Sequence, residues 1–166
     1  MGVVDLARSP GGDEVALKRL TLHGSTEDIA RARQRIEREA EVLTRLDHPN
    51  IVRGVDAFEA NGTAYLVMRY VSGRNLRDSL RDPTGFRPSP QSLPLLLGPL
   101  LDALDTLHRH DLLHCDIKPD NILTSGVHAL VSDFGVAKAV SDASDASGIT
   151  TVGVALGTPS YMAPEQ

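Results

Sequence analysis

Alternating and periodic apolar positions predict strands and one long helix in the first part of the chain. Val3–Ala7 and Val15–Lys18 are short β-type runs, and the Ser-Pro-Gly-Gly segment at residues 9–12 is typical of a turn between them. From about Glu27 to Leu46, apolar residues recur at spacings of three and four residues. The pattern therefore predicts a β-hairpin followed by a long amphipathic helix.

The next segment predicts a second hairpin and then a change to helix and loop. Ile51–Ala60 and Ala64–Val71 have strand patterns, and the Asn61-Gly62 pair between them is a strong two-residue hairpin signal. Gly73–Asp82 is expected to form a short helix. Asp82–Pro94 contains four prolines, which favours a loop.

Leucines at positions 97, 100, 101, 104 and 107 predict a second long helix, bent near Pro99. Two short strands are expected on either side of Ser125-Gly126. Residues 140–157 are small and polar, which is typical of a mobile loop. The order of elements, with strands and one helix first and a helical part afterwards, indicates an α+β fold.

Composition and charge limit the classes of function. The chain has 166 residues, of which 41% are hydrophobic and 23% charged, as in ordinary globular domains. Its net charge of −5 gives no electrostatic basis for binding nucleic acid or an anionic membrane. Cys115 is the single cysteine, so no intrachain disulfide forms, and no apolar run reaches spanning length. We expect a cytoplasmic chain with no membrane segment and no nucleic-acid partner.

The strongest chemical signal lies at residues 114–121, His-Cys-Asp-Ile-Lys-Pro-Asp-Asn, followed by Asp-Phe-Gly at residues 133–135. Asp116 can orient an attacking hydroxyl group, and Lys118 can neutralise a phosphate during transfer. The side chains of Asn121 and Asp133 supply the hard oxygen ligands that Mg²⁺ prefers. This inventory predicts transfer of a phosphoryl group held by Mg²⁺.

These motifs resemble those of eukaryotic-type (Hanks-type) serine/threonine protein kinases in their bacterial style. The Val-Ala-Leu-Lys strand that ends at Lys18 is similar to the family's Val-Ala-Ile-Lys, and residues 157–165 resemble the end of its activation segment. The resemblance implies a two-lobe kinase fold. Residues 1–71 would form a small β-rich N-lobe with one long helix and the hinge, and residues 72–166 only the first part of the helical C-lobe.

The resemblance also implies the site residues and the cofactors ATP and Mg²⁺. Lys18 would contact the α- and β-phosphates and pair with Glu39, Asp116 would act as the base, and Lys118 would stabilise the transferring group. The implied magnesium ligands are Asn121 and Asp133. The implied nucleotide-binding residues, with Met68 as gatekeeper, are Val4, Ala16, Lys18, Met68, Arg69, Val71 and Leu123.

In the activation segment, Thr150 and Thr151 stand where relatives often autophosphorylate, Thr158 lies near the catalytic aspartate, and Glu165 is an ion-pair member by resemblance. The implied partner is a protein with a Ser or Thr acceptor. Self-association for trans-autophosphorylation is a further expectation. Because Cys115 replaces the arginine usual in the family, loop phosphorylation is expected to matter less here; alternatively, Cys115 simply fills a buried gap.

Two departures from the family point to an incomplete catalytic domain. Only Gly2 remains of the glycine-rich loop, and the sequence stops at Gln166. Without the later helices, the leucine-rich helix would expose a face built for burial. Residues 1–166 alone are therefore expected to be marginally stable and weakly active.

Two other functions stay open. The first is a pseudokinase or truncated ATP-binding regulatory module, favoured by the missing glycines and by Cys115. The second is a small-molecule phosphotransferase of the aminoglycoside-kinase kind, which shares a His-x-Asp-x-x-x-x-Asn loop. The retained polar residues of the site argue against the first function. Lys118 and the segment 158–165 argue against the second.

Overall fold

The computed structural model describes residues 3–21, 25–125, 128–133 and 159–161. The chain divides into two compact units, each with its own packing. Among the described residues, the first unit holds those in Met1–Asp47 and Arg53–Tyr70. The second unit holds those in His48–Val52, Val71–Phe134 and Gly157–Gln166.

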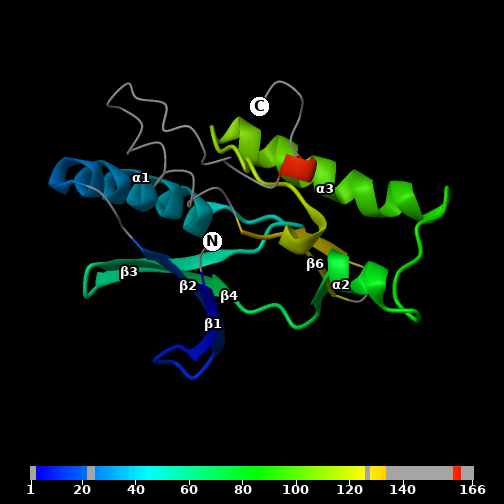
Figure 1. The fold of residues 1–166 in the computed structure, drawn as a ribbon, viewed down its shortest axis with the longest axis horizontal. Helices are drawn as coiled ribbons and strands as arrows, with labels where there is room; N and C mark the ends of the chain where they lie inside the picture. Colours follow the sequence, from blue (N-terminus) through cyan, green and yellow to red (C-terminus); the bar gives the residue numbers. More distant parts are fainter. Residues whose placement is uncertain (1–2, 22–24, 126–127, 134–158, 162–166) are drawn as a thin grey trace. The chain divides into compact units, whose positions relative to one another are not determined.

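A four-stranded antiparallel sheet forms the first unit, with strand order β1-β2-β4-β3. Its strands are β1 (Val3–Arg8), β2 (Glu14–Thr21), β3 (Gly54–Ala60) and β4 (Thr63–Arg69), coloured blue to green in Figure 1. Between β3 and β4, Asn61 and Gly62 have φ angles of 52° and 71°. This left-handed pair matches the twist of the flanking strands and confirms the predicted hairpin turn.

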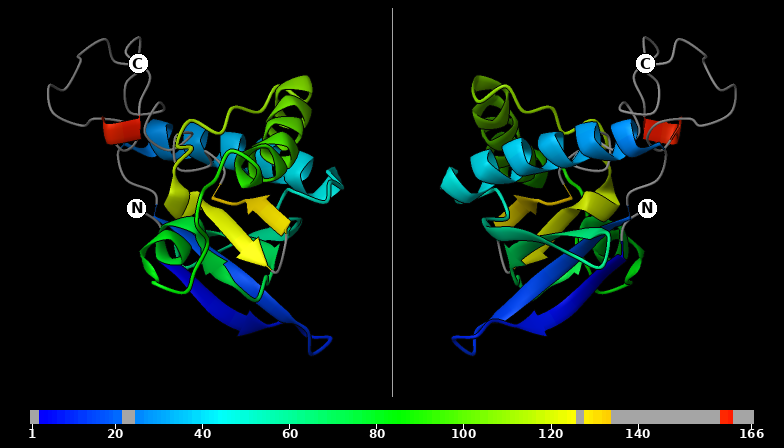
Figure 2. Two further views of the ribbon diagram at one scale, coloured as in Figure 1. Left: turned by 90° about the vertical axis from the view of Figure 1, so that its right-hand side faces the viewer. Right: turned by 90° about the vertical axis from the view of Figure 1, so that its left-hand side faces the viewer.

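The helix α1 (Thr26–Arg45) lies across the sheet of the first unit, as Figure 2 shows. Ile36, Ala40 and Leu43 are buried, which is the stripe that the three- and four-residue spacing predicts. The helix comes very close to β3, since a Cβ atom on Gly54 would lie 3.0 Å from the carbonyl carbon of Leu43. The absence of a side chain at position 54 permits this approach.

The strand predicted over Ile51–Ala60 begins later than expected, at Gly54. Ile51 instead forms an isolated parallel bridge with Val131 in the second unit. The Val52 N–H donates to the Val131 carbonyl at 2.9 Å, and the Asn50 side-chain amide donates to the Ala129 carbonyl at 2.7 Å. Because β7 satisfies these groups, residues 51–52 lie beside β7 and do not belong to the hairpin strand.

The second unit combines a small sheet with helices. Its elements are β5 (Arg74–Asn75), α2 (Leu76–Arg81), α3 (Ser92–Arg109), η1 (Pro119–Asn121), β6 (Ile122–Ser125), β7 (His128–Val131) and η3 (Pro159–Tyr161). The sheet has the order β5-β6-β7, with antiparallel pairs. The two short strands predicted around Ser125-Gly126 are confirmed as β6 and β7.

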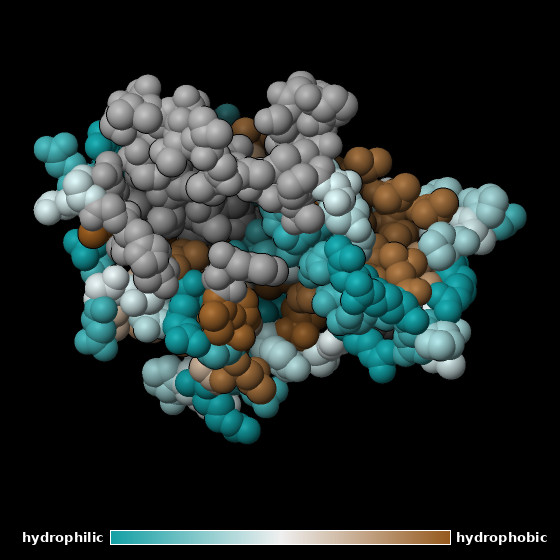
Figure 3. All heavy atoms as spheres, viewed as in Figure 1, coloured by the Kyte–Doolittle hydropathy of each residue, from teal (hydrophilic) through white to brown (hydrophobic). Residues whose placement is uncertain are grey.

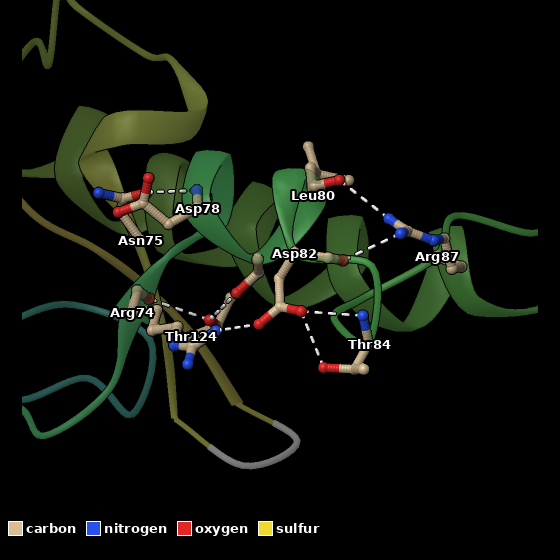
Figure 4. A network of polar contacts seen from close by, with 9 residues as sticks. Arg74, Asn75, Asp78, Leu80, Asp82, Thr84, Arg87 and Thr124 are labelled. Atoms are coloured by element: carbon tan, nitrogen blue, oxygen red, sulfur yellow. Dashed lines mark hydrogen bonds and ion pairs between the residues drawn. The ribbon is translucent and has the colours of Figure 1, made fainter.

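The helix predicted over Gly73–Asp82 is shorter, because its first residues pair with β6. Arg74 lies opposite Thr124, and a Cβ atom on Gly73 would lie 2.2 Å from the Thr124 carbonyl oxygen. The Asn75 side chain then caps α2 by accepting a hydrogen bond from the Asp78 N–H at 2.8 Å (Figure 4). A strand and a cap therefore occupy the positions expected to be helical.

The proline-rich segment ends three residues earlier than predicted, because α3 starts at Ser92. Pro94 lies in the first helical turn, where no backbone N–H is needed. Hydroxyl groups order this start: the Ser92 N–H donates to the Ser89 hydroxyl at 3.0 Å. The helix continues through Pro99, and the bend predicted there stays a prediction.

The two sides of α3 differ sharply. Leu100, Ala103 and Leu107 are buried, whereas Leu95 is 77% exposed and Leu101 64% exposed. Figure 3 shows an apolar surface over this helix. No helix in the described ranges is long and apolar enough to cross a membrane.

Candidate active site

The loop that follows α3 is anchored by a buried histidine. The His114 side chain is buried, and its Nε2 lies 2.8 Å from the Ser132 carbonyl oxygen. The Asp116 N–H lies 3.3 Å from His114 Nδ1 and donates to it. Because Nδ1 accepts, we assign the ring proton to Nε2, which donates to Ser132. His114 thus fastens the loop to the residue just before Asp133.

Cys115 lies in the left-handed region, with φ at 60°, and is half-buried. For a residue other than glycine this conformation costs about 1 kcal/mol. The turn that it makes lets His114 point inward while the next residue, Asp116, directs its carboxylate to the other polar groups of the loop. Strain of this kind is typical of a functional site.

Two side chains hold the carboxylate of Asp116. Lys118 Nζ lies 2.7 Å from Asp116 Oδ2, and the Asn121 amide nitrogen donates to the same oxygen at 3.0 Å. Asn121 also donates to the Asp116 carbonyl at 2.8 Å. The Asp116 side chain is 31% exposed and that of Lys118 10% exposed. The result is a fixed carboxylate, beside an ammonium group, that solvent and substrate can reach.

The short helix η1 brings these residues together. Lys118 is extended, Pro119 starts the 3-10 turn, and the Asn121 N–H donates to the Lys118 carbonyl at 2.9 Å. The Ser132 N–H and hydroxyl then both donate to the Asn121 carbonyl, at 2.9 and 3.1 Å. Asp133 follows directly, with φ at 59°. Strands β6 and β7 bring the chain back on itself, so Ser132 lies beside Asn121, and Asp133 is the residue after Ser132.

The donor groups suit magnesium. The Asn121 side-chain nitrogen donates to Asp116, so a cation would have to be bound by the amide oxygen. The role of the Asp133 carboxylate as a second ligand stays a prediction. Mg²⁺ prefers a few such oxygen ligands and takes the rest from phosphate and water. In the part of the chain that the structure describes, no three His, Cys, Asp or Glu residues form a metal-binding group, so a closed all-protein cage is absent there.

In the first unit, four predicted nucleotide-binding residues share one face of the sheet. Ala16 lies directly opposite Met68, and Val4 lies opposite Lys18. Alternation along β2 puts Ala16 and Lys18 on the same side. Lys18 and Met68 are only 5% and 4% exposed, respectively. A lysine is seldom so buried in a sheet, which supports a particular role for this one.

The remaining predicted residues stand as follows. The Arg69 N–H, at the end of β4, donates to the Arg53 carbonyl just before β3 at 2.9 Å. Val71 and Leu123 belong to the second unit, and their approach to the residues of the first unit stays a prediction. The Glu39 side chain lies outside the described part of the chain, as do Thr150, Thr151, Thr158 and Glu165.

The structure adds one ion pair that the sequence analysis did not single out. Arg77 Nε lies 2.6 Å from Asp120 Oδ1, and Asp120 is the residue just before Asn121. Hydrogen bonding to Arg77 lowers the pKa of Asp120, and the same bond raises the pKa of Arg77. The position of Asp120 inside the catalytic motif is a signal that the sequence contains. Arg77 lies 43 residues earlier, and no motif in the sequence marks it as a site residue.

Comparison with known proteins identifies the family. The family model described as "Protein kinase domain" matches residues 1–166. Among curated proteins, the chain is 39% identical to the serine/threonine-protein kinase pkn2 of Myxococcus xanthus over 93% of its length. It is 38% identical to PknJ of Mycobacterium tuberculosis over 99% of its length. It spans only 18% of pkn2 and 28% of PknJ.

Solved structures agree. The chain matches the M. tuberculosis PknI kinase domain with a TM-score of 0.66 and 32% identity, over 82% of this chain and 54% of that one. A crystal structure of Rad53 in complex with AMP-PNP matches with a TM-score of 0.67 and 30% identity, over 81% of this chain and 35% of that one. These matches confirm the predicted kinase-like α+β fold. The chain belongs to the protein kinase domain family.

Proposed function

We propose that this chain is part of the catalytic domain of a serine/threonine protein kinase. Residues 1–71 would supply the N-lobe and hinge and residues 72–166 the first part of the C-lobe. The observation that carries the proposal is the arrangement at Asp116. Its Oδ2 forms an ion pair with Lys118 Nζ and accepts a hydrogen bond from the Asn121 side-chain amide. The names of the curated relatives, which are serine/threonine-protein kinases, support the same class.

In this proposal Asp116 orients the hydroxyl group of a substrate serine or threonine toward the γ-phosphate of ATP. Lys118 stands beside the same carboxylate, so its positive charge lies close to the group being transferred. Fixed charges of this kind stabilise the transition state without reorganisation. Asn121 and Asp133 would hold Mg²⁺, which neutralises phosphate charge when it is bound.

Binding of ATP is proposed for the nucleotide-binding residues that the kinase resemblance implies. Lys18 would contact the α- and β-phosphates, and Val4, Ala16 and Met68 would contact the adenine, with Arg69, Val71 and Leu123 as further nucleotide-binding residues. The burial of Lys18 and Met68 supports this assignment. The pairing of Lys18 with Glu39 belongs to the same proposal.

The proposed partner is a protein with a Ser or Thr acceptor, and the proposed location is the cytoplasm. Thr150 and Thr151 are proposed autophosphorylation sites, reached by transient self-association of two copies. Thr158 would lie near Asp116, and Glu165 would join an ion pair.

Transfer of radiolabelled γ-phosphate from Mg²⁺-ATP to a basic acceptor protein tests the proposal in the full-length protein. We expect Asp116→Asn to lower kcat by about 100-fold or more, because the group that orients the hydroxyl is lost. The matched control is Asp111→Asn, since Asp111 is exposed and its left-handed conformation suits asparagine. That variant is expected to keep wild-type kcat.

The alternatives give different outcomes in the same assay. Binding of ATP without transfer, equal in wild type and Asp116→Asn, would indicate a regulatory pseudokinase. Transfer to an aminoglycoside but not to the protein acceptor would indicate a small-molecule phosphotransferase. Either result would overturn the proposed function.

A further inference from the structure

Arg77 contacts two segments of the second unit that are far apart in the sequence. Its Nε lies 2.6 Å from Asp120 Oδ1 in η1. Its Nη2 lies 3.4 Å from the Tyr161 hydroxyl in η3, and its guanidinium carbon lies 5.8 Å from the centre of the Tyr161 ring. One side chain therefore bridges the catalytic loop and the short helix η3 at Pro159–Tyr161.

The backbone that carries Arg77 is itself fixed to the strand that follows the catalytic loop. Asn75 pairs with Leu123 in β6 and caps α2 through its side chain. In addition, the Ser79 hydroxyl lies 3.0 Å from the Thr124 hydroxyl, within hydrogen-bond distance. Since β6 begins directly after Asn121, Arg77 and the catalytic loop share one framework. The helix α2, which carries Arg77, is thus held against β6 by the pairing of Asn75 and by the contact between Ser79 and Thr124.

Asp120 depends on this contact. Its side chain is 31% exposed, yet Oδ2 is buried and, among the described residues, has no hydrogen-bond partner. The Oδ1 atom accepts a hydrogen bond from Arg77. Removing the guanidinium would therefore leave a partly buried carboxylate without the cation that pairs with it. Such a group relieves its desolvation by moving toward water. Asp120 cannot move without disturbing Asn121, its neighbour in the three-residue turn of η1.

We propose that Arg77 is a positioning residue for phosphoryl transfer. It holds Asp120 and Tyr161 in one arrangement, and through Asp120 it keeps Asn121 and Asp116 in register with each other. The inference rests on the proposed function, because the reaction that it serves is kinase transfer. The planar fork and the stacking contact both matter, so lysine replaces arginine only in part at this position.

The test measures kcat for acceptor phosphorylation in the full-length protein, at temperatures well below the melting point of each variant. We expect Arg77→Gln to lower kcat about tenfold and Asp120→Ala to do the same, as loss of a charged hydrogen bond would. Because both single variants break the same contact, the double variant is also expected to lower kcat about tenfold and not a hundredfold. Arg77→Lys is expected to recover part of the loss.

The matched control is Arg74→Gln. Arg74 precedes the same helix and also pairs with an aspartate, but that partner, Asp82, follows α2 and is not part of the catalytic loop. Its removal is expected to leave kcat within about twofold of wild type. A general loss of stability in this part of the fold would instead lower the melting temperature in both variants without a selective change in kcat.

Hydrogen exchange of the backbone N–H groups of Ser160 and Tyr161 gives a second measurement that needs no catalysis. We expect faster exchange in Arg77→Gln, where the Tyr161 contact is lost, and unchanged exchange in Arg74→Gln. If kcat is unchanged in Arg77→Gln, or if the two single effects multiply in the double variant, the positioning role is wrong. If the wild type transfers no phosphate, the proposed function fails, and unchanged exchange in Arg77→Gln would then refute the contact itself.

Discussion

At the scale of single residues, Asn121 shows why a carboxamide suits this site. Its nitrogen donates to both the carbonyl and the carboxylate of Asp116, which leaves its oxygen for a cation. An aspartate would be the same size but could not donate, and it would place a second negative charge about 3 Å from the first. The amide thus connects the orientation of Asp116 to the proposed magnesium site through one side chain.

Asp82 provides a prediction about acid stability. The Thr84 N–H and hydroxyl both donate to Asp82 Oδ1, and Arg74 pairs with Oδ2 (Figure 4). These contacts, chiefly those with Thr84, lower the pKa of Asp82 from 3.8 to about 2. Because the pKa is lower in the folded state, the stabilisation is complete above pH 3.8 and is lost as the pH falls toward 2.

Urea unfolding of wild type and Asp82→Asn between pH 2 and about pH 7 checks this sign. The difference in the free energy of unfolding is expected to be constant near neutral pH and to shrink in acid. Thr84→Ala, which removes only the hydroxyl contact, should show the same trend with a smaller amplitude. A difference that does not vary between the two pH limits would contradict the assignment.

Some residues of the candidate site could be expected to lie together from the sequence and others could not, for a physical reason; the roles of all of them stay predictions. Asp116, Lys118 and Asn121 lie within six residues, so one tight turn suffices to bring them together, and their types alone indicate the chemistry. The contact between Arg77 and Asp120 depends on how β5 pairs with β6 and on the cap of α2. No local pattern records such long-range pairing. The roles of Glu39 and of the activation-segment residues stay predictions.

At the scale of elements, the junction between β5 and α2 depends on a glycine. Gly73 has φ at 157°, and its backbone lies against the Thr124 carbonyl. We expect Gly73→Ala to lower the free energy of unfolding by about 2 kcal/mol, because the new methyl group must displace β6. The control, Gly11→Ala, has ordinary contacts of 3.6 Å or more and is expected to be neutral or slightly stabilising.

Urea unfolding of both variants of the 166-residue chain measures this effect. Equal stabilities of Gly73→Ala and wild type would show that the close approach of the two strands can relax without loss. Since β6 follows the catalytic loop directly, Gly73→Ala is also expected to reduce kcat in the full-length protein.

The types of the longer elements were predicted correctly, while several of their ends were not, and the strand β5 and the 3-10 turns η1 and η3 were missed. Periodicity reports which face of a segment is buried, and this was sufficient for α1, α3 and the hairpins. The ends depend on partners elsewhere. Ile51 lies outside the strand predicted for it because it forms a bridge with Val131 of β7. The helix α3 begins at Ser92, inside the predicted loop, because the Ser89 hydroxyl accepts a hydrogen bond from the Ser92 N–H.

At the scale of the whole molecule, the exposed side of α3 carries information about what else the domain contains. Leu95, Leu97 and Leu101 are all exposed on a helix whose other side is well packed. The chain spans 54% of the PknI kinase domain that it matches. Within a longer kinase domain of this kind, we expect the part that this chain does not match to cover this surface.

This expectation predicts that the same substitutions have a small effect on stability in the 166-residue chain and a large effect in the full-length protein. In the 166-residue chain, Leu95→Gln with Leu101→Gln is expected to reduce self-association and to change the free energy of unfolding by about 0.5 kcal/mol or less. In the full-length protein, each substitution is expected to cost about 1.5–3 kcal/mol, because a buried leucine is lost.

Sedimentation velocity and urea unfolding, applied to both proteins, decide the matter. Val55→Thr serves as the control, since Val55 is an exposed apolar residue of the first unit and is expected to have little effect in either protein. Equal small effects of the leucine substitutions in the two proteins would mean that this side of α3 stays uncovered.

The register between β2 and β4 restricts where this chain can change in length. Side chains alternate between the two faces of a sheet, so the loss of one residue inside β2 would move its lysine to the opposite surface, together with every later residue of that strand. The ammonium group would then exchange places with the neighbouring Leu17 or Arg19. Insertions and deletions are therefore tolerable in the turns of this unit, at residues 9–12 or around Asn61, but not within its strands.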